Sequence, residues 1–326
     1  MDKPFVSVVI PVYNAKDTIG LCLESVLAQD YPADRYEVLA VDNNSTDSSA
    51  HIIRSYPVTY LREDKIQSPS GARNKGVRNA KGDIIAFIDS DCIAVRDWIS
   101  QGVKSMRDKS LGAVGGKITA YKPTSYLERY QDRAGILWHV VDDESLAQAK
   151  ARLVTANAFF RKSIFAQVGL FDTIYKGAGE DTDISYAIQR QTNFTIAYNH
   201  HAAVYHKHRT TLYGFWKQQF RYGYNNILLH NKYDPFIIHE ITKDVLRFGY
   251  LKSFYWRLRN EDFFNHIKTV FKMLAKYVVS FSNDRKTAFF DSFLFASGRC
   301  AASYGEYKAF RDHHDLLFNN TGDKKV

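Results

Sequence analysis

The sequence has 326 residues, 45% of them hydrophobic and 24% charged, the proportions of an ordinary globular protein with room for one α/β domain and a helical appendage. Three widely spaced cysteines, Cys22, Cys92 and Cys300, argue against a disulfide framework or a zinc site and fit a reducing compartment. The net charge of +9 favours anionic partners, such as nucleic acid, anionic lipid or phosphorylated substrates, without choosing among them.

The sequence shows no pattern of secretion or of membrane insertion. Residues 1–5 lead directly into a strand-like segment and lack the features of a signal peptide. No uninterrupted apolar stretch reaches the roughly 18 residues that a spanning helix needs. The sequence therefore predicts a cytoplasmic protein, either free or peripheral on the inner face of the membrane.

The first 90 residues alternate between short buried strands and helices. Strands are predicted over 6–11, 36–41 and 83–88, and helices over 14–29 and 71–80. Strands that alternate with helices in this way predict an α/β fold with a doubly wound parallel sheet. Ligands bind such sheets beyond the carboxyl ends of the strands, where this chain has polar residues: Tyr13, Asn14, Asp42, Asp89 and Asp91.

The rest of the chain changes character twice. Residues 110–210 contain shorter strand-like pieces and more loops. From about Leu212 onward the pattern is helical, with one apolar stripe running from Ile267 to Phe281. Only residues 319–326 have the composition of a loose tail.

Asp89-Ser90-Asp91 directly follows a buried apolar strand. Residues i and i+2 of an extended segment point the same way. Either both carboxylates converge on one cation, or one binds a metal and the other a sugar. Oxygen ligands of this kind suit Mg²⁺ or Mn²⁺, for which one or two carboxylates plus substrate phosphates suffice. A surface turn is the alternative explanation.

Three further segments carry groups capable of chemistry. Glu180-Asp181 opens a predicted helix, so Asp181 is either a helix-terminal acid or a general base. His206 and His208 end an alternating segment, and either is a candidate metal ligand. Arg221 follows Gln218 by three residues and has a side chain suited to a diphosphate, although a helix-surface charge is the simpler explanation.

Taken together, these motifs resemble the inverting family-2 glycosyltransferases with the GT-A fold. The matching segments are 7–14 (the opening strand and nucleotide loop), 41–47, 71–76, 89–91, 155–157, 180–181, His206, and Gln218-x-x-Arg221-Tyr222, in which Tyr replaces the Trp of processive members. The similarity covers about residues 5–224. It implies a GT-A fold, a Rossmann-like mixed sheet, followed by a helical C-terminal extension.

The resemblance also implies roles for individual residues. Pro11, Tyr13, Asn14 and Asp42 would hold the base and ribose; Arg73 and Arg221 the phosphates; Ser90, Asn157 and Glu180 the rest of the donor, together with Asp89. Asp89, Asp91 and His206 would bind Mn²⁺ or Mg²⁺. Asp181 would be the catalytic base that takes the acceptor proton, and a single displacement would invert the anomeric centre.

We therefore expect a catalytic domain over 1–224, with a nucleotide-sugar half over about 1–110 and an acceptor half over about 111–224, and an extension over 225–326. The expected donor is a UDP- or GDP-linked sugar and the expected acceptor a glycan, a lipid-linked glycan or a protein, in surface polysaccharide or glycan assembly. Aromatic and basic residues of the extension, 254–259 with Lys268, Lys272 and Lys276, favour contact with an anionic membrane or polyprenyl-linked acceptor. Packing on the catalytic domain, or a homodimer through these helices, is the alternative.

Three other functions compete with glycosyl transfer. A nucleotidyltransferase that makes sugar nucleotides would need a glycine-rich phosphate loop, whereas residues 11–14 contain no glycine. A basic protein that binds nucleic acid or membrane without catalysis fits the charge, but no nucleic-acid-binding motif is present, and we expect no nucleic-acid partner. The intact acids Asp89, Asp91 and Asp181 argue against a catalytically dead scaffold.

Overall fold

The computed structural model describes residues 3–175, 177–234 and 283–312. The chain divides into two compact units, Met1–Thr211 and Leu212–Val326. The boundary lies before α9 (Leu212–Tyr233), which is one continuous helix. The domain boundary expected after residue 224 lies within this helix and stays a prediction.

The first unit is built on one eight-stranded mixed sheet of order β3-β2-β1-β4-β7-β6-β8-β5. β1 to β4 pair in parallel, β7 is antiparallel to β4 and β6, β6 and β8 are parallel, and β5 is antiparallel to β8. The strands are β1 (Val6–Val12), β2 (Tyr36–Asp42), β3 (Thr59–Arg62), β4 (Ile84–Ile88), β5 (Cys92–Ala94), β6 (Leu111–Ala120), β7 (Asn157–Arg161) and β8 (Thr195–His206). The predicted mixed α/β sheet is confirmed.

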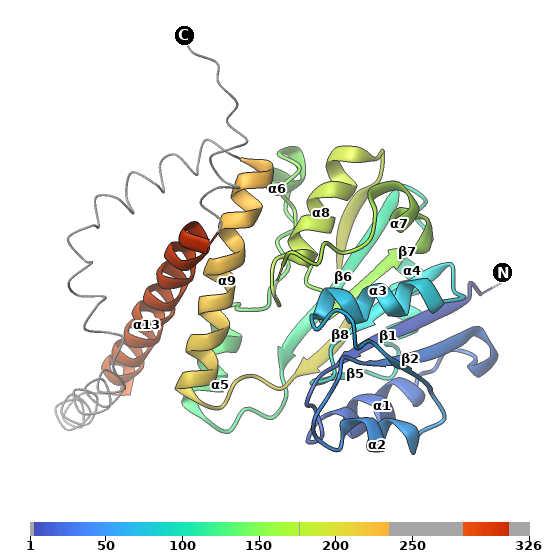
Figure 1. The fold of residues 1–326 in the computed structure, drawn as a ribbon, viewed down its shortest axis with the longest axis horizontal. Helices are drawn as coiled ribbons and strands as arrows, with labels where there is room; N and C mark the ends of the chain where they lie inside the picture. Colours follow the sequence, from blue (N-terminus) through green and yellow to red (C-terminus); the bar gives the residue numbers. More distant parts are fainter. Residues whose placement is uncertain (1–2, 176, 235–282, 313–326) are drawn as a thin grey trace, which may run out of the picture. The chain divides into compact units, whose positions relative to one another are not determined.

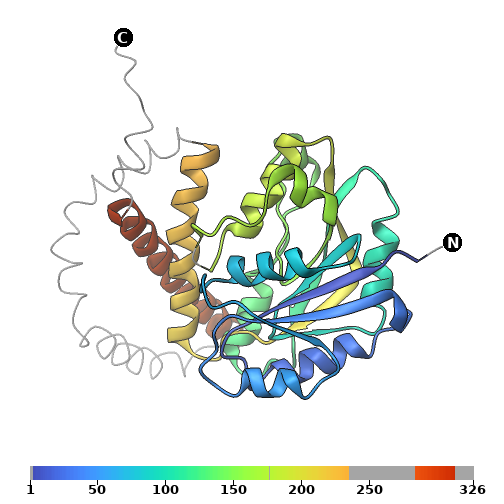
Figure 2. The ribbon, with the colours of Figure 1, turned by 45° about the vertical axis from the view of Figure 1, so that its right-hand side comes forward.

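Helices cover both faces of this sheet. They are α1 (Ile19–Leu27), the 3₁₀ helix η1 (Ala33–Arg35), α2 (Ser49–Arg54), α3 (Pro69–Asn79), α4 (Trp98–Ser105), α5 (Tyr126–Arg133), α6 (Asp143–Ala147), α7 (Lys162–Val168) and α8 (Glu180–Gln191). Figures 1 and 2 show α1 and α2 on one side of β1 and β2 and α3 on the other. The buried side chains accordingly form two clusters, one with α1, α2 and α4 and one with α3, α7 and α8.

β1 is central because its side chains are apolar on both faces. Val8 and Ile10 point into the first cluster and Val9 into the second, as the alternation of a strand requires. α3 approaches β1 closely at Gly76, where an added Cβ would lie 2.3 Å from Val9 Cγ1. A glycine at this position therefore determines how near α3, which carries Arg73, can come to the strand.

The structure also contains elements that the sequence patterns do not predict. α2 and β3 lie between the second and third predicted strands, and β3 has only four residues, none of them buried. The turn after β4 continues into β5, which pairs with the end of β8. Short elements of this kind carry too few residues for a periodicity to appear.

The second unit consists, in its described part, of α9 and α13 (Asn283–Asp312). The two helices touch where Gly223 faces the backbone of Ala302, and the Tyr224 hydroxyl lies 3.3 Å from Asp312 Oδ2. The apolar stripe predicted over 267–281 and the aromatic and basic residues 254–276 lie outside the described residues. Within the described part of the chain, no helix combines the length and the apolar character required to cross a bilayer.

Candidate active site

The acids that follow β4 stand at the carboxyl edge of the parallel strands. β4 ends at Ile88, and the backbone amide of Cys92 donates to the carbonyl oxygen of Asp89, closing a tight turn around Asp89-Ser90-Asp91. β5 then pairs with β8 in a register that sets Cys92 opposite His206. The pairing of the short strand β5 with the end of β8 therefore brings the Asp89-Ser90-Asp91 turn next to His206, more than 100 positions away in the sequence.

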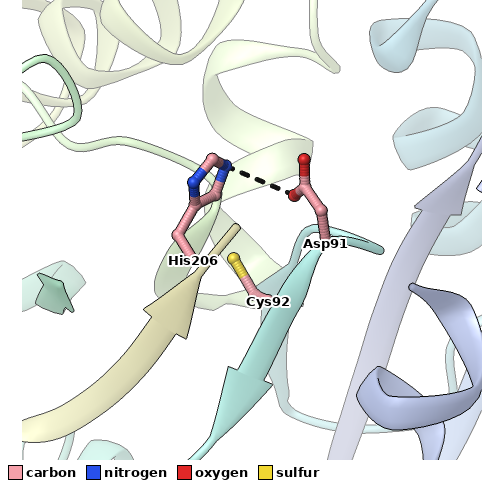
Figure 3. Close-up of side chains that lie close together, drawn as sticks. All are labelled: Asp91, Cys92 and His206. Carbon is pink, nitrogen blue, oxygen red and sulfur yellow. Dashed lines mark ion pairs between the residues drawn. The ribbon is translucent and has the colours of Figure 1, made fainter. Parts of the chain in front are cut away.

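Asp91 and His206 face each other across this edge. The two side chains point toward each other (Figure 3), with His206 Nε2 3.3 Å from Asp91 Oδ1. Arg209 Nη1 lies 3.9 Å from Asp91 Oδ2. His206 is buried, and its Nδ1 atom has no hydrogen-bond partner among the described residues. His208 instead turns to Asp132, with 3.8 Å between its Nε2 and Asp132 Oδ1. Of the two histidines, His206 is the one beside Asp91.

Cys92 completes a group of three side chains whose ligand atoms all lie within 4.8 Å of one another. The sequence does not predict Cys92 as a ligand, because a lone cysteine next to an acidic pair has no metal-binding spacing. Burial raises the pKa of its thiol well above the usual value, and the neighbouring Asp91 and Asp89 add to the effect. Mg²⁺ and Mn²⁺ prefer oxygen and imidazole ligands to a thiol, so Asp91 and His206 are the candidate donors for such an ion.

Arg73 ties the turn after β4 to the start of α8. It is only 4% exposed. Its Nη2 lies 2.8 Å from Asp89 Oδ1 and its Nη1 lies 2.6 Å from Glu180 Oε1. Because Asp89 and Glu180 immediately neighbour the Asp91 turn and Asp181, this one guanidinium fixes both segments against each other. Both acids that the resemblance assigns to the donor are thus ion-paired inside the protein.

Asp181 occupies the first turn of α8 and is half-buried. Its Oδ1 accepts a hydrogen bond of 2.8 Å from the amide of Thr182. Burial raises the pKa of Asp181, and Arg73 and backbone amides partly offset this increase. A carboxylate with a raised pKa and an accessible edge has the properties of a general base.

The predicted nucleotide end lies at the ends of β1 and β2. Asp42 is buried; its Oδ1 accepts from the amide of Ser45 (3.1 Å) and its Oδ2 from the hydroxyl of Tyr60 (3.1 Å). Asn14 adopts a positive φ of 48°, and its Oδ1 accepts from the amide of Thr46 at 2.8 Å. The loops after the two strands are therefore fastened together. Tyr13, which is 52% exposed, follows directly after β1.

Residues 7–169 match the family model described as Glycosyl transferase family 2. A relative with broader coverage is Glycosyltransferase AglE of Haloferax volcanii, which is 33% identical over 69% of this chain and 73% of its own length. The chain belongs to glycosyltransferase family 2. It is therefore an enzyme, a glycosyltransferase.

Two further comparisons show how much of the chain is similar to other glycosyltransferases. Poly(ribitol-phosphate) beta-glucosyltransferase of Bacillus spizizenii is 37% identical over 34% of this chain, a stretch that spans only 19% of that longer protein. The structure of the mannosyltransferase PcManGT from Pyrobaculum calidifontis, in complex with GDP-Man and Mn²⁺, is similar over 100% of this chain and 89% of its own, with a TM-score of 0.55 and 21% identity. That likeness supports the GT-A fold of this glycosyltransferase.

Three of the predicted donor residues have surroundings that bear on their roles. Asn157 is fully buried, and its amide accepts from Trp98 Nε1 and donates to the carbonyl oxygens of Lys117 and Ala202. These bonds hold β6, β7 and β8 together, and a direct donor contact for Asn157 stays a prediction. Ser90 and Pro11 are partly exposed at the strand ends.

Arg221 lies on α9, in the second unit. Its assignment to the diphosphate stays a prediction from the sequence motif. In the first unit, by contrast, the site residues are in direct contact: Arg73 with Asp89 and Glu180, and Asp91 with His206.

Tyr60 is a site residue that sequence reasoning missed. Its hydroxyl fixes Asp42, and the Arg54 guanidinium carbon lies 4.0 Å from the centre of its ring. It stands on β3, whose four residues carry no recognisable pattern. Its contact with Asp42 depends on the pairing of β3 with β2, which no local sequence signal predicts.

Proposed function

We propose that this glycosyltransferase transfers a sugar from a UDP- or GDP-linked donor to an acceptor hydroxyl by a metal-dependent, inverting displacement. The observation that carries the proposal is the Arg73 bridge. It joins the turn of Asp89 and Asp91, which faces His206, to the segment of Glu180 and Asp181. Arg73 thereby fixes the candidate cation site and the candidate base, Asp181, relative to each other.

Asp91 and His206 suit a divalent cation. Neighbouring ligands of an octahedral Mg²⁺ or similar ion at about 2.1 Å stand roughly 3 Å apart. The Asp91 Oδ1 to His206 Nε2 distance of 3.3 Å is close to this spacing. When bound, the ion would neutralise charge on the leaving diphosphate. Two protein donors leave most positions for phosphate oxygens and water, as is usual for Mg²⁺.

Asp181 would accept the proton of the attacking hydroxyl. Its ionised form is required, and the Arg73 guanidinium close by favours that form. Asp89 and Glu180 already neutralise the charge of Arg73. The main role of Arg73 is therefore to position the turn after β4 and the start of α8. The expected phosphate contact of Arg73 would need one of these ion pairs to open.

The nucleotide would lie over the joined loops after β1 and β2. Asp42 and Tyr60 form a polar contact point for a base. Tyr13 and Asn14 lie in the loop after β1, which is bonded to the loop after β2. Because the amide of Ser45 and the Tyr60 hydroxyl orient both oxygens of Asp42, the carboxylate is preorganised to accept a hydrogen bond from a base N–H. Both uracil and guanine offer such a donor, which keeps UDP and GDP as the proposed carriers.

A thermal-shift panel of nucleotide sugars tests the proposal. A donor present at 100 times its Kd should add about 2.7 kcal/mol to the free energy of unfolding. We expect a shift for one UDP- or GDP-sugar that grows when Mn²⁺ or Mg²⁺ is added. Asp42→Asn should reduce the shift, whereas a nucleotide sugar that binds equally well with and without metal would contradict the metal-dependent part of the proposal.

A further inference from the structure

A second concave site lies in the first unit, next to the candidate active site. It has a volume of about 340 Å³, at the lower end of the range of small-molecule sites. Its walls come from β6, from β8, from the end of α5 and from the loop that follows α5. The lining residues are Lys117, Ile118, Thr119, Asp132, Leu137, Trp138, His139, Val141 and Tyr198.

Two aromatic side chains of this cavity face solvent. Trp138 is 58% exposed and Tyr198 is 46% exposed. The indole of Trp138 lies over Gly135, where an added Cβ would come within 2.5 Å of the ring, and Gly135 has a φ of +63°. Both the left-handed backbone and the close contact require glycine there. The turn after α5 thus holds the indole of Trp138 against Gly135 while leaving most of the side chain exposed. Packing in the protein core does not account for a tryptophan at this position.

The floor of the cavity is rigid and uncharged. His139 Nδ1 accepts from the amide of Val154 at 3.0 Å, so its other nitrogen, Nε2, must donate to the carbonyl oxygen of Gly116, 2.7 Å away. Burial lowers the pKa of His139 to about 4, which keeps the ring neutral. Its centroid lies 5.7 Å from that of Tyr198. The imidazole therefore supports the tyrosine ring and leaves the cavity floor apolar.

The cavity reaches the candidate active site through Asp132. Asp132 Oδ1 accepts from the amide of Ala120 at 2.8 Å and lies 3.8 Å from His208 Nε2. Ala120 pairs with His206, whereas Gly115 pairs with Tyr198. Five residues of β6 separate the two pairs, or about 16 Å at 3.3 Å per residue. The cavity therefore starts beside the histidines and extends away from them along the strand.

The cavity is separate from the proposed base site. Asp42 and Tyr60 belong to β2 and β3, and in the sheet order β1, β4 and β7 lie between β2 and β6. Four strand spacings of about 4.8 Å place β2 and β6 roughly 19 Å apart. A base and ribose held at β2 do not reach the aromatic cavity at β6, so the cavity is not part of the proposed base site.

We propose that this cavity is an acceptor subsite that binds a sugar ring of a glycan, a ring other than the one that is attacked. This inference rests on the proposed function and names its acceptor class: an oligosaccharide, free or attached to a carrier. The faces of Trp138 and Tyr198 match the C–H face of a pyranose. Asp132, Lys117 and Thr119 supply the acceptors and donors that its hydroxyl groups need.

A purely apolar occupant fits the cavity less well. A lipid chain would cover Asp132 and Lys117 without offering them hydrogen bonds, and burying unpaired charges is costly. A sugar ring combines apolar and hydroxyl-bearing surfaces, as this lining does. Because the cavity extends away from the histidines, we expect a single monosaccharide to bind weakly, since it would engage either the reaction centre or the aromatic rings and not both.

A printed array of mono- and oligosaccharides, probed with the full chain, tests the proposal. We expect the wild-type chain to retain oligosaccharides and not monosaccharides. For the best oligosaccharide, Trp138→Ala and Tyr198→Ala should each weaken the Kd about tenfold or more, as truncation of an aromatic anchor does. Trp138→Phe should retain most of the affinity, because it keeps a flat ring. Tyr213→Ala, which removes a 62% exposed tyrosine outside the cavity, should bind as wild type.

Donor hydrolysis without acceptor separates this inference from the proposed function. Trp138→Ala should release nucleoside diphosphate at the wild-type rate and unfold at the wild-type temperature, since Trp138 is largely exposed. If the wild-type chain hydrolyses donor but retains no oligosaccharide, or if both alanine variants bind the oligosaccharide with the wild-type Kd, the subsite is overturned while the proposed function stands. If the wild-type chain hydrolyses no donor under any metal condition, the proposed function itself fails.

Discussion

Arg73 shows how one buried side chain organises several charges. One ion pair joins it to Glu180, which is buried at the start of α8, and the other to Asp89, which is partly exposed in the turn after β4. Removing one member of a buried pair costs about 3–5 kcal/mol, because the remaining charges are left uncompensated. A residue that the family resemblance assigns to phosphate is, in this structure, first of all the link between the metal-side turn and the base.

Replacing Asp181 by Asn should lower turnover by about 10²–10⁴, the range expected for a general acid–base group, and leave donor affinity nearly unchanged. Burial raises the pKa of Asp181. Since the base acts when ionised, wild-type turnover should fall on the acid side at a higher pH than an ordinary aspartate would give. A kcat–pH profile and a donor titration check this. An equal loss of donor affinity, or wild-type turnover in the variant, would contradict the assignment.

The two histidines allow a matched comparison. His206 faces Asp91, whereas His208 faces Asp132, and burial together with His206 lowers the pKa of His208 to about 4. We expect His206→Ala to raise the Mn²⁺ concentration needed for half-maximal turnover by about tenfold or more, a loss comparable to that of other metal-site substitutions. His208→Ala should shift it less. Metal titrations of both variants decide the matter, and a larger shift for His208→Ala would make His208 the ligand.

At the scale of elements, the contact of α3 with β1 depends on Gly76. Alanine there would raise helix propensity by about 1 kcal/mol, but its Cβ would lie 2.3 Å from the stiff, fully buried side chain of Val9. Overpacking of this kind costs about 1–3 kcal/mol. We therefore expect Gly76→Ala to lower the free energy of unfolding and to displace Arg73.

Urea unfolding of Gly76→Ala and of Arg78→Ala provides the check. Arg78 is exposed on the same helix, so its replacement should change the free energy of unfolding by no more than about 0.5 kcal/mol. A Gly76→Ala variant as stable as wild type would show that α3 can move away from β1 without loss.

The elements that the sequence predicted are those with a strong period. Mostly apolar runs predict β1, β2 and β4, and the stripe through Ile19, Cys22 and Val26 predicts α1. Residues 14–18, included in that predicted helix, instead form a loop fastened by Asn14 to Thr46. β3 and β5 could not be predicted, because three or four residues define no period and their pairing is decided by distant strands.

At the scale of the whole molecule, the motif order predicted the family and the sheet class correctly, because motifs that follow successive strands must gather at one edge. It could not predict partners across the sheet. The ion pairs of Arg73, the contact of Tyr60 with Asp42 and the cavity of Trp138 and Tyr198 join residues whose separation along the chain carries no pattern. The donor roles of Asn157 and Arg221 rest on motifs alone.

In the proposed reaction, Asp91 and His206 hold a divalent cation on which sugar transfer depends. The most direct test is the release of nucleoside diphosphate from the donor identified by thermal shift, measured with Mn²⁺, with excess chelator and with Mn²⁺ restored. Asp91→Asn and Asp83→Asn form the matched pair, since Asp83 is exposed just before β4, at its opposite end. We predict that chelation and Asp91→Asn each reduce turnover by about 10²-fold or more, which is the effect of losing a group that stabilises charge in the transition state. Restored Mn²⁺ should rescue the wild type, and Asp83→Asn should stay active. Undiminished turnover in chelator, or in Asp91→Asn, would contradict the account.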